Sequence, residues 1–178
     1  MSKVVIVTGG SRGIGKSIVE TLAKERYQVI LNYYHSEQQA KQIQEELKQK
    51  GFLIEIYQAD ISKQEEVNQM IEDIEKKYKK IDVLINNAGI DQFKLFTEIT
   101  KEDWYTMLDT NLTAAFYTSQ KVAQKMIAQK EGCIINISSI WGITGASCEV
   151  HYCVSKARFR WNDEIFSKGI RTIQYTSK

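Results

Sequence analysis

Tyr152 and Lys156 are the residues of this sequence whose types and spacing are best suited to chemistry. Four residues apart on a helix, they share one face, so the Lys ammonium can lie beside the Tyr hydroxyl and favour its ionised form. A free phenol has a pKa of about 10, and bringing it to about 7 takes roughly 4 kcal/mol of differential stabilisation. The pair predicts a proton donor; the alternative is a surface Tyr beside a solvated Lys.

Ser139 lies thirteen residues before Tyr152, directly after the apolar run of residues 133–137. A hydroxyl at the end of a buried strand can reach the same substrate oxygen that the Tyr would protonate. Residues 140–151, which are rich in Gly and small side chains, are expected to form a loop that shapes the substrate mouth.

A glycine-rich turn, TGGSRGIG at residues 8–15, lies between a β-branched run at 4–7 and a helical pattern that continues to Lys24. Such turns bind phosphates because small residues let backbone N–H groups approach and because the helix dipole favours anions. This strand-turn-helix context predicts a dinucleotide site, with a plain structural turn as the alternative.

The residues after the second predicted strand bear on which dinucleotide is bound. Dinucleotide-binding folds often carry an acid about 20 residues past the glycine turn, where it holds the ribose 2′-hydroxyl. Residues 32–36 (NYYHS) offer no acid, and Arg12 in the turn is a suitable counter-charge for a 2′-phosphate. NADP(H) is therefore expected rather than NAD(H), with His35 either assisting or remaining a solvated loop side chain.

Hydrophobic periodicity alternates between the strand and helix types along the chain. This alternation predicts an α/β protein with a doubly wound parallel sheet, a Rossmann fold. The expected strands are residues 4–7, 28–32, 52–58, 81–85 and 133–138, and the expected helices end at Lys24 and span 36–50, 62–79 and 100–130.

Five motifs in a fixed order make the chain resemble the short-chain dehydrogenase/reductase family over roughly residues 1–157. They are TGGSRGIG (8–15), NNAG (86–89), Asn111, Ser139 and YCVSK (152–156). Within the family the chain resembles bacterial reductases of the 3-oxoacyl-[acyl-carrier-protein] and acetoacetyl-CoA type. Residues 139–152 also resemble relatives that reduce an aminopentanone adduct on elongation factor P.

The resemblance implies an NADP(H)-dependent reductase that converts a carbonyl, such as that of a 3-oxoacyl thioester in fatty acid biosynthesis, to an alcohol. Tyr152 would give its proton to the carbonyl oxygen, and Ser139 would hydrogen-bond that oxygen. Lys156 would lower the pKa of the Tyr and contact the nicotinamide ribose, while Asn111 would hold a water on the proton path to solvent.

The resemblance also implies a set of cofactor contacts. Asp60 would accept a hydrogen bond from the adenine amino group, although Asp60 or Ser62 could equally cap the predicted helix at 62–79. The expected cofactor-binding residues are Gly9, Ser11, Arg12, Gly13, Ile14, Gly15, Asp60, Ile61, Asn87, Ala88, Gly89, Tyr152 and Lys156.

Length and composition favour one globular domain, since 178 residues with 43% hydrophobic and 26% charged side chains are ordinary for that class. A net charge of +2 is too small to imply a nucleic-acid or membrane partner. The three cysteines have no metal-binding spacing, so no metal site and a reducing, cytoplasmic location are expected. No secretory signal or membrane span is expected either. The resemblance implies a homo-tetramer.

The resemblance stops at Ala157. Residues 158–178 lack the family's helical apolar stripe. If these residues are written in A/T-rich codons, the reading frame shifted by one base encodes a typical family continuation. The hypothesis is that a single-base insertion near the codon of Arg158 makes residues 158–178 an aberrant tail behind an NADP-binding Rossmann domain at 1–157.

The sheet would then be incomplete at its C-terminal side, ending at residues 133–138 with an exposed apolar edge unless Thr172–Thr176 pairs there. The substrate site and the tetramer would also be in doubt. The alternative function is therefore a nucleotide-binding remnant without catalytic activity.

Overall fold

The computed structural model of the chain describes residues 2–157 and 171–177. Within these residues the protein forms a six-stranded parallel sheet with the strand order β3-β2-β1-β4-β5-β6. The strands are β1 Val4–Val7, β2 Gln28–Tyr33, β3 Ile54–Gln58, β4 Val83–Asn86, β5 Cys133–Ser139 and β6 Arg171–Ser177. The predicted doubly wound α/β fold is confirmed.

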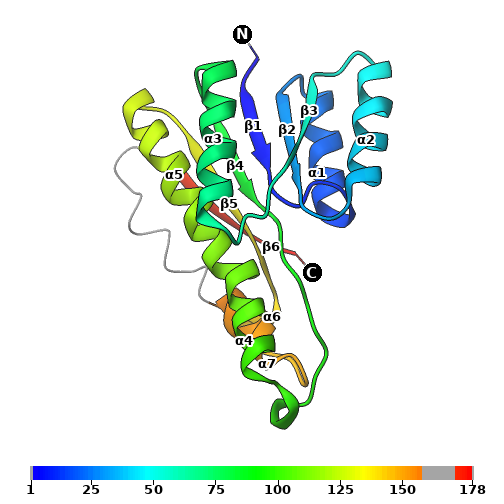
Figure 1. Cartoon of the computed structure of the whole chain (residues 1–178), viewed down its shortest axis with the longest axis vertical. Coiled ribbons are helices and arrows are strands. Elements are labelled where there is room, and N and C mark those ends of the chain that lie inside the picture. The colour runs from blue at the N-terminus through cyan, green and yellow to red at the C-terminus, as the bar shows by residue number, and fades with distance from the viewer. Residues whose placement is uncertain (1, 158–170, 178) are drawn as a thin grey trace.

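Helices connect the strands, and the larger ones cover both faces of the sheet (Figure 1). They are α1 Gly13–Lys24, α2 Glu37–Gln49, α3 Gln64–Tyr78, α4 Lys101–Leu108, α5 Ala114–Gln129, α6 Trp141–Thr144 and α7 Val150–Ala157, with a 3-10 turn at Phe96–Glu98.

The alternation of side chains along β1 explains why the sheet carries two layers of helices. Val4 and Ile6 belong to the core beneath α3 and α5, whereas Val5 and Val7 belong to the core beneath α1 and α2. Successive side chains of a strand point to opposite faces, so a central strand of this fold is apolar throughout. All four residues of β1 are buried.

The chain order places a crevice at one edge of the sheet. From β1 the chain runs outward through β2 to β3, and then crosses back to β4 on the other side of β1. Ligands of doubly wound sheets bind where the order reverses, outside the carboxyl ends of the strands. Helices α4, α6 and α7 lie at this same end of the molecule (Figure 1).

Two predicted elements differ from the structure. The helix expected over 100–130 is interrupted by a π-helical turn at Asp109–Thr113, and such turns are frequent at functional sites. The loop expected over 140–151 contains the one-turn helix α6 and ends where α7 begins at Val150. Gly142 favoured a loop in the sequence, but it lies in α6 at a close approach to α7: a Cβ at Gly142 would lie 2.8 Å from the Lys156 carbonyl.

The backbone of β6 corrects the expected edge of the sheet. Residues 171–177 pair in parallel with β5, from Cys133 opposite Arg171 to Ser139 opposite Ser177. The sheet therefore does not end at residues 133–138, and the pairing suggested for Thr172–Thr176 is the one found. The rest of the predicted tail, 158–170 and 178, lies outside the described residues.

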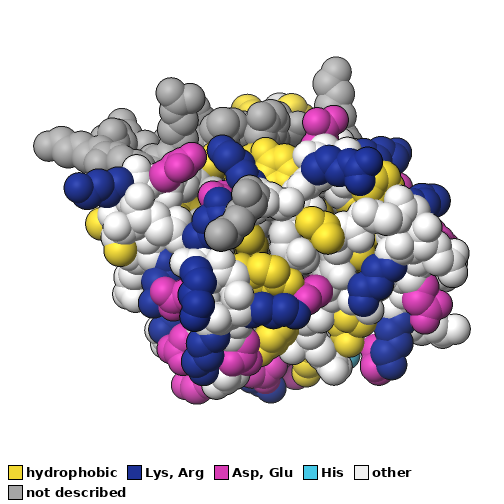
Figure 2. All heavy atoms as spheres, turned by 90° about the horizontal axis from the view of Figure 1, so that it is seen from above, with side chains coloured by type: hydrophobic (Ala, Val, Ile, Leu, Met, Phe, Trp, Pro, Cys, Tyr) yellow, Lys and Arg dark blue, Asp and Glu magenta, His cyan; other side chains and the backbone are white. Residues whose placement is uncertain are grey.

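The surface mixes charges of both signs. Figure 2 views the end at which the strands begin, where basic and acidic side chains lie beside small hydrophobic patches. Ion pairs link neighbouring helices, such as Lys121 with Glu72 at 2.8 Å and Lys125 with Glu75 at 2.6 Å. In the described part of the chain no helix is both long and apolar enough to cross a membrane.

Candidate active site

The glycine turn after β1 is built for close backbone approach. Gly9 has a φ of +64°, and a Cβ there would lie 2.8 Å from the Ala88 Cα. A Cβ at Gly15 would overlap the Gly9 carbonyl. Asn87 closes the same junction, since its Nδ2 donates to the carbonyls of Thr8 at 3.0 Å and Gly9 at 3.2 Å. The ends of β1 and β4 are therefore held together without bulky side chains between them.

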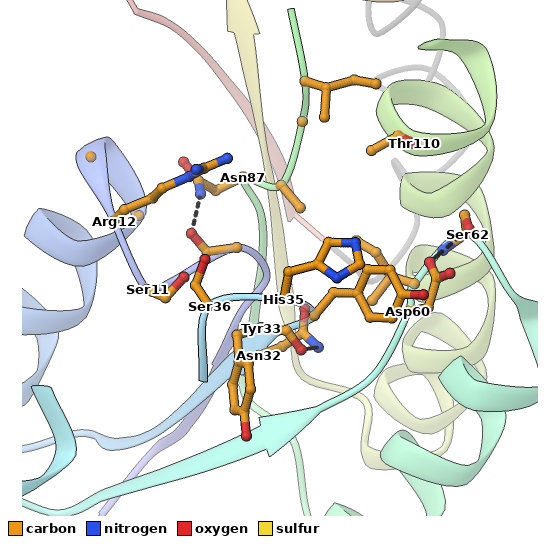
Figure 3. Close-up of a pocket in the computed structure, with 18 of the residues that line it drawn as sticks. Ser11, Arg12, Asn32, Tyr33, His35, Ser36, Asp60, Ser62, Asn87 and Thr110 are labelled. Atoms are coloured by element: carbon orange, nitrogen blue, oxygen red, sulfur yellow. Dashed lines mark hydrogen bonds between the residues drawn. The ribbon is translucent and has the colours of Figure 1, made fainter. Parts of the chain in front are cut away.

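A cleft of about 1070 Å³ opens beside this junction, at the carboxyl ends of the strands. In Figure 3, Ser11 and Arg12 lie on one side of the cleft, Asp60 and Ser62 lie on the other, and His35 lies between them. The cleft brings together eleven of the residues predicted to bind the cofactor: Gly9, Ser11, Arg12, Gly13, Ile14, Gly15, Asp60, Ile61, Asn87, Ala88 and Gly89.

The wall after β2 carries no carboxylate, as the sequence predicts. Asn32 is buried, and its amide donates to the Ala59 carbonyl at 3.1 Å, so it ties β2 to the end of β3. His35 is exposed at the cleft, and its ring centroid lies 3.8 Å from that of Tyr34.

Asp60 belongs to the cleft and not to a helix cap. Its Oδ1 accepts from the backbone N–H of Ser62 at 3.0 Å and from the Ser62 hydroxyl at 2.6 Å. Helix α3 begins only at Gln64, after Lys63, with no side-chain cap. The prediction that Asp60 or Ser62 caps this helix is wrong because the two residues bond to each other in the turn before it.

A second, smaller cavity of about 150 Å³ adjoins the cleft. Tyr152, Lys156, Ile137 and Ser138 line it on one side. The two spaces share Ile14, Asn87, Gly89, Ile90 and Asp91. A molecule in the cleft would therefore border the cavity that holds Tyr152.

Lys156 and Tyr152 lie one turn apart on α7, as predicted. The Lys156 Nζ donates to the Ile137 carbonyl at 3.2 Å and lies 5.8 Å from the centroid of the Tyr152 ring. Only 5% of Lys156 is exposed, and this burial lowers its pKa to about 8. The cavity therefore has a cation that burial makes easy to deprotonate.

The pKa of Tyr152 is raised, contrary to the expectation that Lys156 would lower it. Burial of the phenol is the main cause, and a hydrogen bond with Ser139 acts in the opposite direction. The negative charges of Asp91 and Glu149 add to the increase. In this chain alone, desolvation thus outweighs every group that would stabilise the phenolate.

Ser139 ends β5 as predicted and is buried, and its hydroxyl also accepts from the backbone N–H of Trp141 at 3.2 Å. The neighbouring Ser138 lines the smaller cavity instead, and its hydroxyl donates to the Lys156 carbonyl at 3.1 Å. Sequence reasoning missed Ser138, although the Ser-Ser pair at the strand end marked both positions.

Asn111 lies in the π-helical turn, 1% exposed, and lines neither cavity. Its Oδ1 accepts from the Ile90 N–H at 2.8 Å, and its Nδ2 donates to the Ile90 carbonyl at 2.8 Å and to the Ser155 hydroxyl at 3.0 Å. A Cβ at Gly89 would lie 3.1 Å from that Oδ1 and 3.4 Å from the Lys156 Nζ. The absence of a side chain at Gly89 lets Asn111 and Lys156 approach the same point.

A family model described as short chain dehydrogenase matches residues 3–161, which is most of the chain. The chain belongs to this family. A 3-oxoacyl-[acyl-carrier-protein] reductase from Staphylococcus epidermidis is 41% identical over 157 residues, which cover 88% of this chain and 64% of that protein. The protein of the same name from Synechocystis is 38% identical, with 88% and 63% covered. The chain thus spans less than two thirds of the length of these relatives.

Two solved structures share the fold of this chain. A metagenomic short-chain oxidoreductase in complex with NADP aligns with a TM-score of 0.91 at 27% identity, covering 98% of this chain and 81% of that one. The structure of gox2181 aligns with a TM-score of 0.90 at 28% identity, covering 97% and 70%. Among the residues described for this short chain dehydrogenase, no cluster of acidic, His or Cys side chains is placed to hold a metal ion.

Other residues of this short chain dehydrogenase matter to the site and were not predicted. The Thr8 hydroxyl accepts from the N–H groups of Asn87 and Ala88 at 3.0 and 3.1 Å. Gln92 and His151 bond to each other beside Tyr152. Thr8 opens the glycine motif and was within reach of sequence reasoning, whereas the Gln92 and His151 contact joins residues far apart in the chain.

Proposed function

We propose that this short chain dehydrogenase uses NADPH to reduce the ketone of a 3-oxoacyl thioester to an alcohol. The observation that carries the proposal is that the cavity of Tyr152 and Lys156 shares five lining residues with the glycine-lined cleft. A ketone in the cavity would therefore lie next to the nicotinamide end of an NADPH molecule bound in the cleft. The names of the bacterial relatives and the NADP complex of the solved neighbour support the substrate and the cofactor.

The residues of the cleft fit a dinucleotide phosphate. The first turn of α1 has no acidic side chain, and its N–H groups have no partner within the helix, so it attracts a pyrophosphate. Arg12 is exposed at this turn and lines the cleft, where its guanidinium would pair with a 2′-phosphate. Asp60 would accept from the adenine amino group. When bound, NADPH supplies the hydride.

The phenol of Tyr152 is protonated at neutral pH, as the proton donor of a reduction must be, because its pKa is not lowered from the ordinary value of about 10. Tyr152 would pass its proton to the carbonyl oxygen as negative charge develops there, while the Ser139 hydroxyl donates to the same oxygen. The buried Lys156 ammonium would stabilise the phenolate that remains and contact the nicotinamide ribose.

Asn111 would support this chemistry from behind the cavity. Its bonds to Ile90 and Ser155 hold the cavity wall and α7 at fixed positions, and we expect a water beside it to link Lys156 with solvent. All of these roles fall within residues 1–157. We expect the reaction to run in the cytoplasm, on a ketone carried by a protein or by coenzyme A.

Replacing Tyr152 with Phe tests the proposal. NADPH oxidation with acetoacetyl-CoA should fall at least about a hundredfold in kcat, because the general acid is lost. The Kd for NADPH should stay within a few-fold, since Tyr152 does not line the larger cleft. Tyr105→Phe, at an exposed position of α4, is the matched control and should keep full activity.

Two results would contradict the proposed function. Turnover retained by Tyr152→Phe would exclude Tyr152 as the proton donor. A wild-type chain that binds NADPH and yet reduces no ketone would favour the nucleotide-binding remnant instead.

A further inference from the structure

The buried face of α7 is polar. His151 and Ser155 lie one turn apart on this face, and both are 0% exposed. Each is matched by a hydrogen bond: Ser155 accepts from Asn111, and the His151 Nε2 lies 2.8 Å from the Gln92 Oε1. Hydrogen bonds, in addition to apolar packing, therefore fix the position of this helix against the neighbouring segments.

A chain of polar contacts continues from His151 into α4. The Gln92 Nε2 donates to the Asp103 Oδ1 at 3.0 Å, and the Lys94 Nζ lies 2.5 Å from the Asp103 Oδ2. Thr100 adds its backbone N–H and hydroxyl to the same carboxylate at 2.9 and 2.7 Å. Lys94, Gln92 and Thr100 hold the pKa of Asp103 well below its usual range.

The donors and acceptors of this chain have one consistent assignment. An ionised Asp103 only accepts, so the Gln92 amide must direct its NH₂ group toward it. The Gln92 carbonyl oxygen then faces His151, which must donate from Nε2. The charge of Asp103 thus fixes the tautomer of an imidazole directly adjacent to Tyr152 in sequence, with the proton on Nε2.

Two further sets of contacts hold the opposite wall of the cavity. Asn111 binds both backbone groups of Ile90, and the Lys94 N–H donates to the Cys148 carbonyl at 2.8 Å. Gln92 lies between these two anchors. Ile90 and Asp91, which line the smaller cavity with Tyr152, are therefore fixed from both ends.

We propose that Gln92 and His151 are positioning residues, which hold the Tyr152 hydroxyl and the cavity wall at Ile90 and Asp91 in the geometry that proton transfer needs. Neither touches the reacting atoms. Within the described residues, their hydrogen bond links the side chain of His151 to the connection after β4. This inference rests on the proposed function, in which Tyr152 is the proton donor.

Removing either partner should lower kcat while leaving cofactor binding unchanged. For Gln92→Leu and His151→Leu we expect kcat with acetoacetyl-CoA to fall about tenfold or more, since small misplacements of a reacting group are costly. The Kd for NADPH should stay within about twofold, since neither residue lines the cleft. His151→Gln keeps a donor near the Nε2 position and should recover most of the activity.

Gln129→Leu is the matched control for lost stability. Gln129 also bridges two segments, binding the Ile81 N–H at 3.1 Å and the Ile81 carbonyl at 3.0 Å, but it lies at the end of α5. It should lower the unfolding temperature without changing kcat. An equal loss of kcat in Gln129→Leu and Gln92→Leu, or wild-type kcat in both Leu variants of the network, would overturn the proposal.

A second measurement separates this inference from the proposed function. With fluorotyrosine incorporated, the fluorine NMR signal of Tyr152 is assigned by its loss in Tyr152→Phe. We expect it to shift in Gln92→Leu and His151→Leu, to return toward the wild-type position in His151→Gln, and to stay unchanged in Gln129→Leu. These shifts would support positioning even if the wild type reduces no thioester; an unmoved signal in both Leu variants would overturn it.

Discussion

Arg12 is the single residue on which the proposed choice of cofactor depends. It is exposed at the start of α1 and lines the cleft, and no carboxylate stands at residues 32–36 to repel a 2′-phosphate. Removing a hydrogen bond to a charged group costs about 1.5 to 3 kcal/mol, so Arg12→Ala should weaken NADPH binding about 10- to 100-fold. Fluorescence titration with both cofactors measures this, and NADH binding should change little.

Lys16→Ala provides the control for a general loss of positive charge. Lys16 lies in the same first turns of α1, but its ammonium pairs with Glu20 at 3.6 Å. It should leave the preference between the cofactors intact. Equal weakening of NADPH and NADH in Arg12→Ala would show that Arg12 supports the turn and does not read the 2′-phosphate.

Local spacing made some site residues predictable and left others hidden. Tyr152 and Lys156 share one turn of a helix, so the sequence alone places them together. Gln92 and His151 are 59 positions apart, and nothing near either residue indicates the contact. The raised pKa of Tyr152 was also out of reach because it depends mainly on burial, which is set by the whole fold.

Between elements, the Asn86 side chain joins three polar partners. At the end of β4 it donates to the Asn136 Oδ1 on β5 and to the Ser119 hydroxyl on α5, each at 2.9 Å, and accepts from the Thr118 hydroxyl at 2.7 Å. Asn86→Ala would leave buried polar groups unpaired, so the free energy of unfolding should fall by about 2 to 3 kcal/mol.

Urea denaturation measures this loss, with Asn68→Ala as the control. Asn68 is half-buried on α3, and within the described residues its side chain makes no hydrogen bond, so its removal should cost less than about 0.5 kcal/mol. If both variants unfold at the same urea concentration, β4, β5 and α5 do not depend on Asn86.

The order of elements was predictable because the sequence records which face of each element is buried. Ala40, Ile43 and Leu47 mark one face of α2 in the sequence, and the structure buries those three. The sequence pattern does not indicate the π-helical turn at Asp109–Thr113, because such a turn shifts the backbone hydrogen-bond partners without requiring different types of side chain. The helix expected over 100–130 is continuous in pattern but not in geometry.

For the molecule as a whole, parallel pairing explains why distant segments meet at one cleft. The carboxyl ends of parallel strands share an edge, so the residues after β1, β2, β3 and β4 were expected together and line one cleft. The sequence left two alternatives at the far edge of the sheet: a free edge at residues 133–138, or pairing of residues 172–176 with it. Residues 158–178 lack a family pattern that would decide between them, and the structure shows the pairing of β6 with β5.

The pH dependence of stability should report the burial of Lys156. Its folded pKa of about 8 lies below the unfolded value of 10.5, so the unfolded chain binds more protons between these two pH values. The free energy of unfolding should therefore rise with pH from about 8 to about 10. Tyr57, whose pKa is raised to about 12, and Tyr152 act in the opposite sense only above pH 10, where the unfolded phenols ionise first.

Urea denaturation at pH 7, 8, 9 and 10 tests this with Lys156→Met, which removes the ammonium and keeps the apolar stem. The gain in stability between pH 8 and 10 should disappear in this variant. Lys41→Met is the control, because pairing with Glu37 raises the pKa of Lys41, whereas burial lowers that of Lys156. The Lys41→Met variant should still gain stability between pH 8 and 10. If wild type and Lys156→Met show the same slope against pH, Lys156 is not desolvated in the folded chain, and its proposed place beside the phenol of Tyr152 would have to be abandoned.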